Sequence, residues 1–230
     1  MAKRGKKYSK SAAKVELGKL YPMADAVALV LDTSYSKFVG SLDLSVNLGV
    51  DPRQADQNIR GATPLPFGRG KAVRIVVFAK GQKAIDAQAA GVDYVGADDL
   101  AEKISAGWLD FDQVIATPDM MAVVGKLGRV LGPRGLMPNP KLGTVTFDVV
   151  PAIEQLKAGR SEFKVDKAGI VHTSVGRLNM SAEALVANTE AVLDALVKAK
   201  PGSAKGTYLK KISLSPTMGP GVAVDPIPYR

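Results

Sequence analysis

The chain has 230 residues, of which 46% are hydrophobic and 23% charged, a composition typical of a globular protein with one or two domains. Its formal net charge of +9 favours a polyanionic partner. The absence of cysteine and the presence of a single histidine, His172, exclude disulfides, thiolate metal sites and two-histidine metal sites. We therefore expect neither a metal nor a cofactor.

The N-terminal segment, MAKRGKKYSKSAAK, is strongly basic, and residues 1–19 carry seven basic side chains and one acid. The apolar run AVALVL at 26–31 is too short for a signal peptide or a membrane span. We expect a cytoplasmic protein that does not enter a membrane. The basic segment either contacts a polyanion or only makes the chain more soluble.

Residues 37–49, KFVGSLDLSVNLG, alternate strictly between apolar and polar side chains. Phe38, Leu42, Leu44, Val46 and Leu48 share one face, while Ser41, Asp43, Ser45 and Asn47 share the other. This pattern predicts a strand with one buried and one open face, as in antiparallel sheets.

The middle of the chain, residues 68–158, alternates between strand and helix patterns. Strands are expected at 72–79, 92–96, 112–118 and 143–147, and helices at 82–90, 98–106, 119–127 and 151–159. Such alternation predicts a parallel sheet covered by helices, which is a three-layer, Rossmann-like α/β domain.

The C-terminal part returns to the antiparallel pattern, with two strands around the DKAG turn within 161–176 and a further strand at 208–217. Between them, residues 181–202 form an amphipathic helix capped by Ser181. We predict a discontinuous two-domain protein, in which an α+β domain of residues 1–67 and 159–230 is split by the inserted α/β domain, 68–158. The Gly- and Pro-containing joints at 64–70 and 157–161 indicate a hinge.

The loop GKLGRVLGPRGLMPNPKLG at 125–143 holds five glycines and four basic residues, Lys126, Arg129, Arg134 and Lys141, and no acid. It lacks the Gly-Lys-Ser/Thr ending of a P-loop, and it follows a helix and not a strand. A nucleotide-binding enzyme that uses the inserted domain stays the alternative function. The basic side chains either touch RNA phosphates or only flank structural turns.

Small polar side chains gather on the open faces of the flanking strands. They are Ser41, Asp43, Ser45, Asn47, Lys164, Asp166, His172, Ser174, Lys211, Ser213, Ser215 and Thr217. Short hydroxyls and amides let a nucleic-acid backbone approach closely, and they can bond to ribose 2′-OH groups. The alternative is a plain solvated face.

Four segments together carry a resemblance to a known family. They are LGVDPRQADQNIRGATPLPFGRGK at 48–71, DYVGADDL at 93–100, GKLGRVLGPRGLMPNPKLGTV at 125–145 and SPTMGPGV at 215–222. The chain resembles the bacterial L-one family of large-subunit ribosomal proteins over nearly its whole length. The resemblance implies a non-enzymatic RNA-binding protein with a split domain and an inserted α/β domain.

The resemblance also implies the partners. A member of this family is expected in the cytoplasm, in the large ribosomal subunit, bound to ribosomal RNA at the mobile stalk near the tRNA exit site. There it assists release of deacylated tRNA from the exit site. It also represses translation by binding its own operon messenger at a mimic of the ribosomal site. When free it is expected to be a monomer.

Site residues follow from the resemblance position by position. The implied RNA-binding residues are Lys37, Phe38, Ser41, Asp43, Asp166, Lys167, Thr217, Met218 and Gly219, and the basic side chains of the 125–143 loop make secondary phosphate contacts. Asp43 and Lys211 depart from the residues familiar at these positions. Strand parity places Phe38 and Met218 on the apolar side, so core packing is the alternative role for both.

Overall fold

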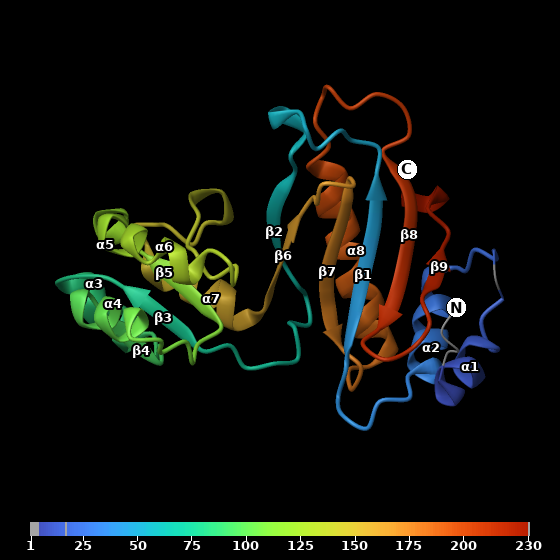
Figure 1. Ribbon diagram of the computed structural model, residues 1–230, viewed down its shortest axis with the longest axis horizontal. Helices are drawn as coiled ribbons and strands as arrows, with labels where there is room; N and C mark the ends of the chain where they lie inside the picture. Colours follow the sequence, from blue (N-terminus) through green and yellow to red (C-terminus); the bar gives the residue numbers. More distant parts are fainter. Residues whose placement is uncertain (1–4, 17, 230) are drawn as a thin grey trace. The chain divides into compact units, whose positions relative to one another are not determined.

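The computed structural model describes residues 5–16 and 18–229, without the side chains of Ala55 and Lys141. The first four residues of the basic N-terminal segment therefore lie outside the described part. The fold mixes helices with parallel and antiparallel sheets (Figure 1). The chain divides into two compact units, residues 1–71 with 160–230 (unit 1) and residues 72–159 (unit 2).

Unit 1 is an α+β unit. Its helices are α1 (Lys6–Ala12), α2 (Met23–Thr33) and α8 (Ala182–Lys198), with short 3-10 helices η1 (Ala55–Gln57) and η4 (Ile227–Tyr229). Its strands are β1 (Ser41–Leu48), β2 (Arg60–Pro64), β6 (Arg160–Lys164), β7 (Ile170–Arg177), β8 (Leu209–Pro216) and β9 (Val222–Val224).

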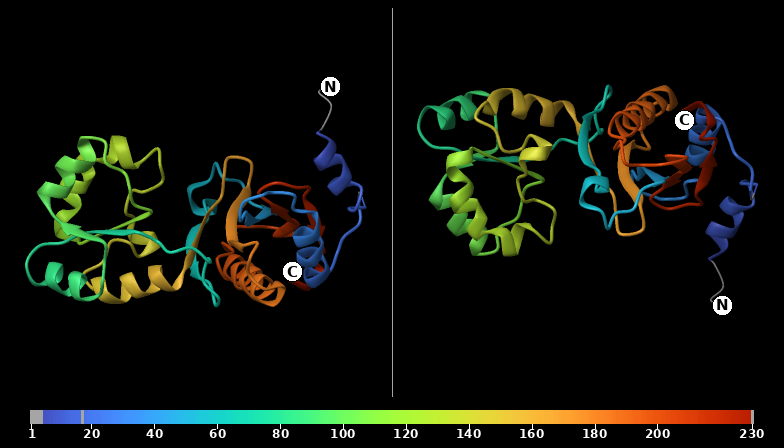
Figure 2. Two further views of the ribbon diagram at one scale, coloured as in Figure 1. Left: turned by 90° about the horizontal axis from the view of Figure 1, so that it is seen from below. Right: turned by 90° about the horizontal axis from the view of Figure 1, so that it is seen from above.

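The main sheet of unit 1 is antiparallel, with strand order β7-β1-β8-β9. Helices α2 and α8 contact each other and pack on the same side of this sheet (Figure 2). The apolar side chains of β1, among them Leu42, Leu44 and Val46, are fully buried in the core below the helices. The alternation predicted for 37–49 is confirmed over Ser41–Leu48, where buried and partly exposed residues alternate, but not before Ser41, since Phe38 is exposed.

Strands β2 and β6 form a separate two-stranded sheet. Strand β6 meets β7 through one backbone bridge, Val165–Val171, and through the side chains of Ser161 and Thr173, whose hydroxyl oxygens lie 2.6 Å apart. The two strands around the DKAG turn are therefore present, but they do not form a continuous ladder.

The first joint between the units is held by a buried amide. Asn188 of α8 accepts a hydrogen bond from the backbone N–H of Phe67 (3.1 Å) and donates to the carbonyls of Gly68 and Val175 (2.9 Å each). Because the Asn188 side chain is itself buried, these bonds attach residues 67 and 68 to unit 1, which continues to Lys71.

Unit 2 has a parallel three-stranded sheet of order β4-β3-β5. Its strands are β3 (Ile75–Phe78), β4 (Tyr94–Gly96) and β5 (Gln113–Ala116). Its helices are α3 (Gln82–Ala89), α4 (Asp98–Ser105), α5 (Met121–Lys126), α6 (Gly128–Leu131) and α7 (Val149–Ala158), with η2 (Pro118–Met120) and η3 (Pro140–Leu142). One apolar cluster joins one sheet face to α4, α5 and α6, and a second joins the other face to α3 and α7, which makes three layers.

One predicted strand of unit 2 is wrong. Residues 143–147 form no strand and touch the sheet through a single parallel bridge, Val145 with Ala116. The predicted helix 119–127 begins as the 3-10 turn η2, and a second short helix follows at Gly128. Both differences arise in short segments, where tertiary contacts outweigh local pattern.

Candidate nucleic-acid interface

The face of the main sheet opposite α2 and α8 is lined by small polar side chains in register. Asp43 pairs across β1 with Ser174 on one side and Ser215 on the other. In the next row, Ser45 lies between His172 and Ser213. Together with Ser41, Asn47 and Lys211 these residues make up what we call the polar face.

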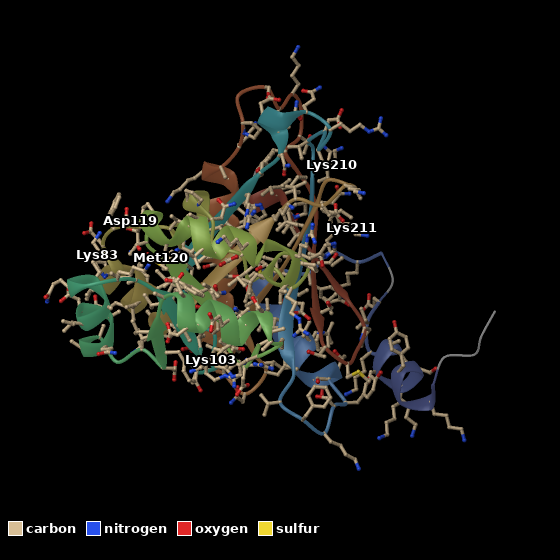
Figure 3. The ribbon with its side chains drawn as sticks, turned by 60° about the vertical axis from the view of Figure 1, so that its left-hand side comes forward. Lys83, Lys103, Asp119, Met120, Lys210 and Lys211 are labelled. Carbon is tan, nitrogen blue, oxygen red and sulfur yellow. The ribbon has the colours of Figure 1, made fainter. Side chains whose placement is uncertain are left out.

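Figure 3 labels Lys211 beside Lys210, on the first residues of β8. Lys211 and His172 are exposed, while the shorter side chains between them are half-buried by their neighbours. Lys164 does not belong to the polar face, because it ends β6 in the separate two-stranded sheet. The predicted stripe of polar residues is thus present on three strands of one sheet.

At one end of the polar face, Thr217 closes the edge between β8 and β1. Its Oγ1 accepts from the backbone N–H of Ser41 at 2.8 Å. Phe38 and Met218 are exposed by 58% and 42%, so the core-packing alternative does not hold for either. The exposed Lys37 precedes Phe38, and at Gly219 a Cβ atom would lie 2.5 Å from the ring of Pro216. This end combines two apolar side chains open to solvent with a crowded turn that excludes larger residues.

At the opposite end, Asp166 and Lys167 form the turn between β6 and β7, and both are exposed. One carboxylate oxygen of Asp166 accepts from the backbone N–H groups of Ile170 and Ala168, at 2.8 Å each. The pKa of Asp166 is lowered, mainly by the bond from Ile170, which stabilises the charged form. Its other oxygen lies 3.8 Å from Nε2 of His172, whose Nδ1 is 3.0 Å from the hydroxyl of Ser45.

The Ser45–His172–Asp166 array does not have the setting of a hydrolytic triad. The His172 side chain is 60% exposed on an open sheet, so water is not excluded from it. The wide spacing to Asp166 also makes a weak orienting contact. The array is better suited to presenting polar atoms to a partner than to activating a nucleophile.

Arg177 lies beside the polar face and was missed from sequence. Burial raises the pKa of Asp43, and the positive charge of Arg177 and a hydrogen bond from Ser174 partly oppose that shift. Counting by twos from Ser174 would place Gly176 on this face. A bulge between Leu42 and Asp43 shifts the register, so that Arg177 pairs with Ser41. Only a signal for the bulge would have identified Arg177.

The basic loop of unit 2, residues 125–143, exposes three of its four basic side chains. Lys126 ends α5, Arg129 lies in α6 and Arg134 lies in the following turn, and all three are exposed. The side chain of Lys141 lies outside the description. The loop displays positive charge on these three side chains.

Among the described residues, no helix is long and apolar enough to cross a membrane. In that same part of the chain, no group of three or more His, Asp or Glu side chains is placed to hold a metal ion.

Comparison with known proteins supplies the family. The model of the Ribosomal protein L1p/L10e family matches residues 30–220. The large ribosomal subunit protein uL1 of Desulfotalea psychrophila is 54% identical over 230 residues, covering 100% of this chain and 98% of that protein. A match of this length and identity confirms the resemblance seen in the sequence: the chain belongs to the Ribosomal protein L1p/L10e family.

Proposed function

We propose that the polar face binds large-subunit ribosomal RNA. The observation that carries the proposal is the row-by-row alignment of small polar side chains over three strands, on the sheet face opposite α2 and α8. The family is one of structural ribosomal proteins and not of enzymes, so the nucleotide-binding enzyme is set aside. The name of the Desulfotalea relative supports the large subunit, in the cytoplasm, as the location.

Recognition on this face is by shape more than by charge. The hydroxyls of Ser45, Ser213 and Ser215 can donate to and accept from ribose 2′-OH groups, which line the shallow groove of an RNA helix. Phe38 and Met218 at one end can pack on sugar or base. Lys37, Lys167 and Lys211 supply the phosphate contacts at the two ends of the face.

We infer the more detailed role from membership of the family. We place the protein at the mobile stalk near the tRNA exit site, where it assists release of deacylated tRNA, and it is a monomer when free. By presenting the same face to its own operon messenger it represses translation of that messenger. Unit 1 is the main RNA-binding domain, and unit 2, residues 72–159, is inserted in it. The exposed basic side chains of the 125–143 loop make secondary phosphate contacts.

One substitution tests the polar face. Ser213→Glu sets a carboxylate in its centre, where it would meet the RNA backbone. We expect at least about a hundredfold weaker binding to purified large-subunit ribosomal RNA in a filter assay, because a buried like charge is costly. Ser105→Glu, at an exposed position of α4, is the control and should bind as the unchanged protein does. Equal affinity of the two variants would remove the polar face from the interface.

A further inference from the structure

A second concave site lies on unit 1, away from the polar face, where β8 begins. It is a pocket of about 400 Å³ lined by Val197, Lys200, Gly206, Thr207, Tyr208, Leu209 and Tyr229. These residues come from the end of α8, the loop after it, the start of β8 and η4. Both the volume and the mostly apolar lining are typical of sites that hold a small planar group.

The two aromatic side chains of the pocket are held rigidly. Tyr208 is buried, and its hydroxyl donates to the carbonyl of Leu196 at 2.9 Å. Burial raises the pKa of Tyr208 to about 12, so it stays a neutral donor. The hydroxyl of Tyr229 reaches Glu190 at 3.5 Å. Because both hydroxyls are engaged by the protein, the rings present mainly apolar surface to the pocket.

The charge on the Tyr208 side of the rim is positive. Lys200 Nζ lies 5.8 Å from the centre of the Tyr208 ring, which brings the ammonium group to the pocket. Residues 195–224 hold five lysines (198, 200, 205, 210 and 211) and no acid. On the Tyr229 side, the charges of Glu190 and Asp194 both act on the Tyr229 hydroxyl, which contacts Glu190. An aromatic pocket with a lysine at its mouth suits a planar ring that carries an anionic group.

We propose that this pocket binds one unstacked nucleotide of the RNA, with the base against the tyrosine rings and the phosphate at Lys200. The proposal rests on the proposed function, since the RNA on the polar face would supply the nucleotide. Leu209 of the pocket is two residues from Lys211 of the polar face, so an RNA strand that leaves this face at the start of β8 passes the pocket. Stacking of a base on an aromatic ring is tolerant of sequence and is a common way to hold single strands.

Two probes locate the binding. Adenosine monophosphate and the hexanucleotide (A)6 are titrated into the full chain, with the tyrosine ring signals followed by NMR. We expect both probes to shift the Tyr208 and Tyr229 signals, and (A)6 to bind more tightly because its neighbouring phosphates meet Lys210. Inorganic phosphate alone should leave the rings unshifted. Ring shifts with phosphate alone, tighter binding of the monophosphate than of (A)6, or no shift with either nucleotide would each overturn the proposal.

Two variants with a matched control test the residues. Lys200→Ala should weaken (A)6 binding about five- to tenfold, whereas Lys198→Ala, in the same last turn of α8 but outside the pocket, should change it less than about twofold. Val197→Trp, at a side chain that is 39% exposed, should fill the pocket and abolish the ring shifts while the fold stays intact. Equal losses at Lys198 and Lys200 would mean diffuse charge attraction and would overturn the site.

The experiments can refute the proposed role of the polar face and that of the pocket independently. Ser213→Glu should lose ribosomal RNA binding yet keep the ring shifts caused by adenosine monophosphate. Normal ribosomal RNA binding by a chain whose tyrosine signals ignore both nucleotides removes the pocket alone. Persistent ribosomal RNA binding by Ser213→Glu, with the ring shifts intact, removes the polar face alone.

Discussion

Asp43 lies on the proposed RNA-binding face, and its charge lowers the stability of the free protein. Burial raises the pKa of Asp43 in the folded state, so the folded chain holds its proton to a higher pH than the unfolded chain does. The stability that this proton contributes is present below the unfolded pKa of about 3.9 and is lost as the pH rises through the folded pKa. At neutral pH the charged Asp43 is therefore destabilising.

We predict that Asp43→Asn raises the melting temperature at pH 7 by roughly 1–3 °C and leaves it unchanged near pH 3. The amide removes the buried charge while keeping the shape of the side chain. Thermal unfolding followed by circular dichroism at both pH values checks the sign. A lower melting temperature at pH 7 would mean that Arg177 stabilises the carboxylate more than burial destabilises it.

Asp166 is expected to behave in the opposite way. Its pKa is lowered by backbone N–H groups, so its contribution to stability is present above the unfolded pKa and is lost as the pH falls through the folded pKa. Asp166→Asn keeps an acceptor for the turn but loses the charge. We predict a lower melting temperature at pH 7 and no difference near pH 2, measured beside Asp43→Asn under the same conditions.

The Met218→Ala substitution distinguishes a role of this side chain in RNA binding from a role in core packing. Because this side chain is exposed, Met218→Ala should leave the free energy of unfolding nearly unchanged and weaken RNA binding by about 1–3 kcal/mol, as truncation of an interface anchor does. Met120→Ala is the matched control, because that side chain is only 2% exposed and its truncation should cost about 2–5 kcal/mol of stability. A Met218→Ala protein that is less stable but binds RNA normally would assign Met218 to packing.

Elements with a long periodic pattern were predictable from the sequence, and so were the short strands β3, β4 and β5, whereas several other short elements were not. The strict alternation in β1 and the capped pattern of α8 match the observed strand and helix, and Ser181 Oγ accepts from the N–H of Ala184 as expected. Helix α2 was not predicted, because its apolar run AVALVL lacks a clear polar face. Strands β2 and β9 are too short to show a period.

The residues of the candidate site were likewise only partly predictable from the sequence pattern. The polar faces of the strands follow from alternation alone, whereas Phe38, Met218 and Gly219 came from the family resemblance, because parity assigns the first two to the core. Their exposure depends on where β1 and β8 end, and strand ends are the least predictable part of an element. The neighbourhood of Arg177 depends on a bulge that no local pattern announces.

The attachment of β6 to β7 depends on hydroxyl groups. Ser161 Oγ also lies 3.0 Å from the carbonyl of Ser174, and Thr173 Oγ1 lies 2.9 Å from that of Glu162. Two hydroxyl protons serve three contacts, so the two side chains share one hydrogen-bond network. Each of Ser161→Ala and Thr173→Val should lower the free energy of unfolding by about 1–2 kcal/mol.

The double variant tests the coupling within this network. If the hydroxyls act together, removing both should cost less than the sum of the two single losses, in urea unfolding of all four proteins. Strictly additive losses would mean that each side chain bonds to the backbone independently. In that case the contact between the two hydroxyls contributes nothing of its own.

At the scale of the whole molecule, the polar face lies entirely in unit 1. A chain in which a short linker replaces residues 72–159 should therefore keep RNA affinity within about tenfold, the loss expected from a few secondary phosphate contacts. Circular dichroism establishes that the shortened chain folds, and filter binding gives its affinity. Loss of binding in a folded unit 1 would transfer the main interface to unit 2.

The net charge of +9 overstates the electrostatic part of binding. The polar face and its ends offer four cations, Lys37, Lys167, Lys211 and Arg177, and each neutralised phosphate adds roughly 0.7–0.9 to the slope of log K against log salt. We expect a slope of about 3–4, and in any case below about 6. The basic residues 1–19 are the only large source of further charge in unit 1 outside the polar face and the 195–224 segment. A steeper slope that falls to this range when residues 1–19 are removed would mean that the N-terminal segment, and not the polar face, dominates affinity. A slope of about 3–4 that does not change when residues 1–19 are removed would instead support recognition of RNA mainly by shape and hydroxyl contacts.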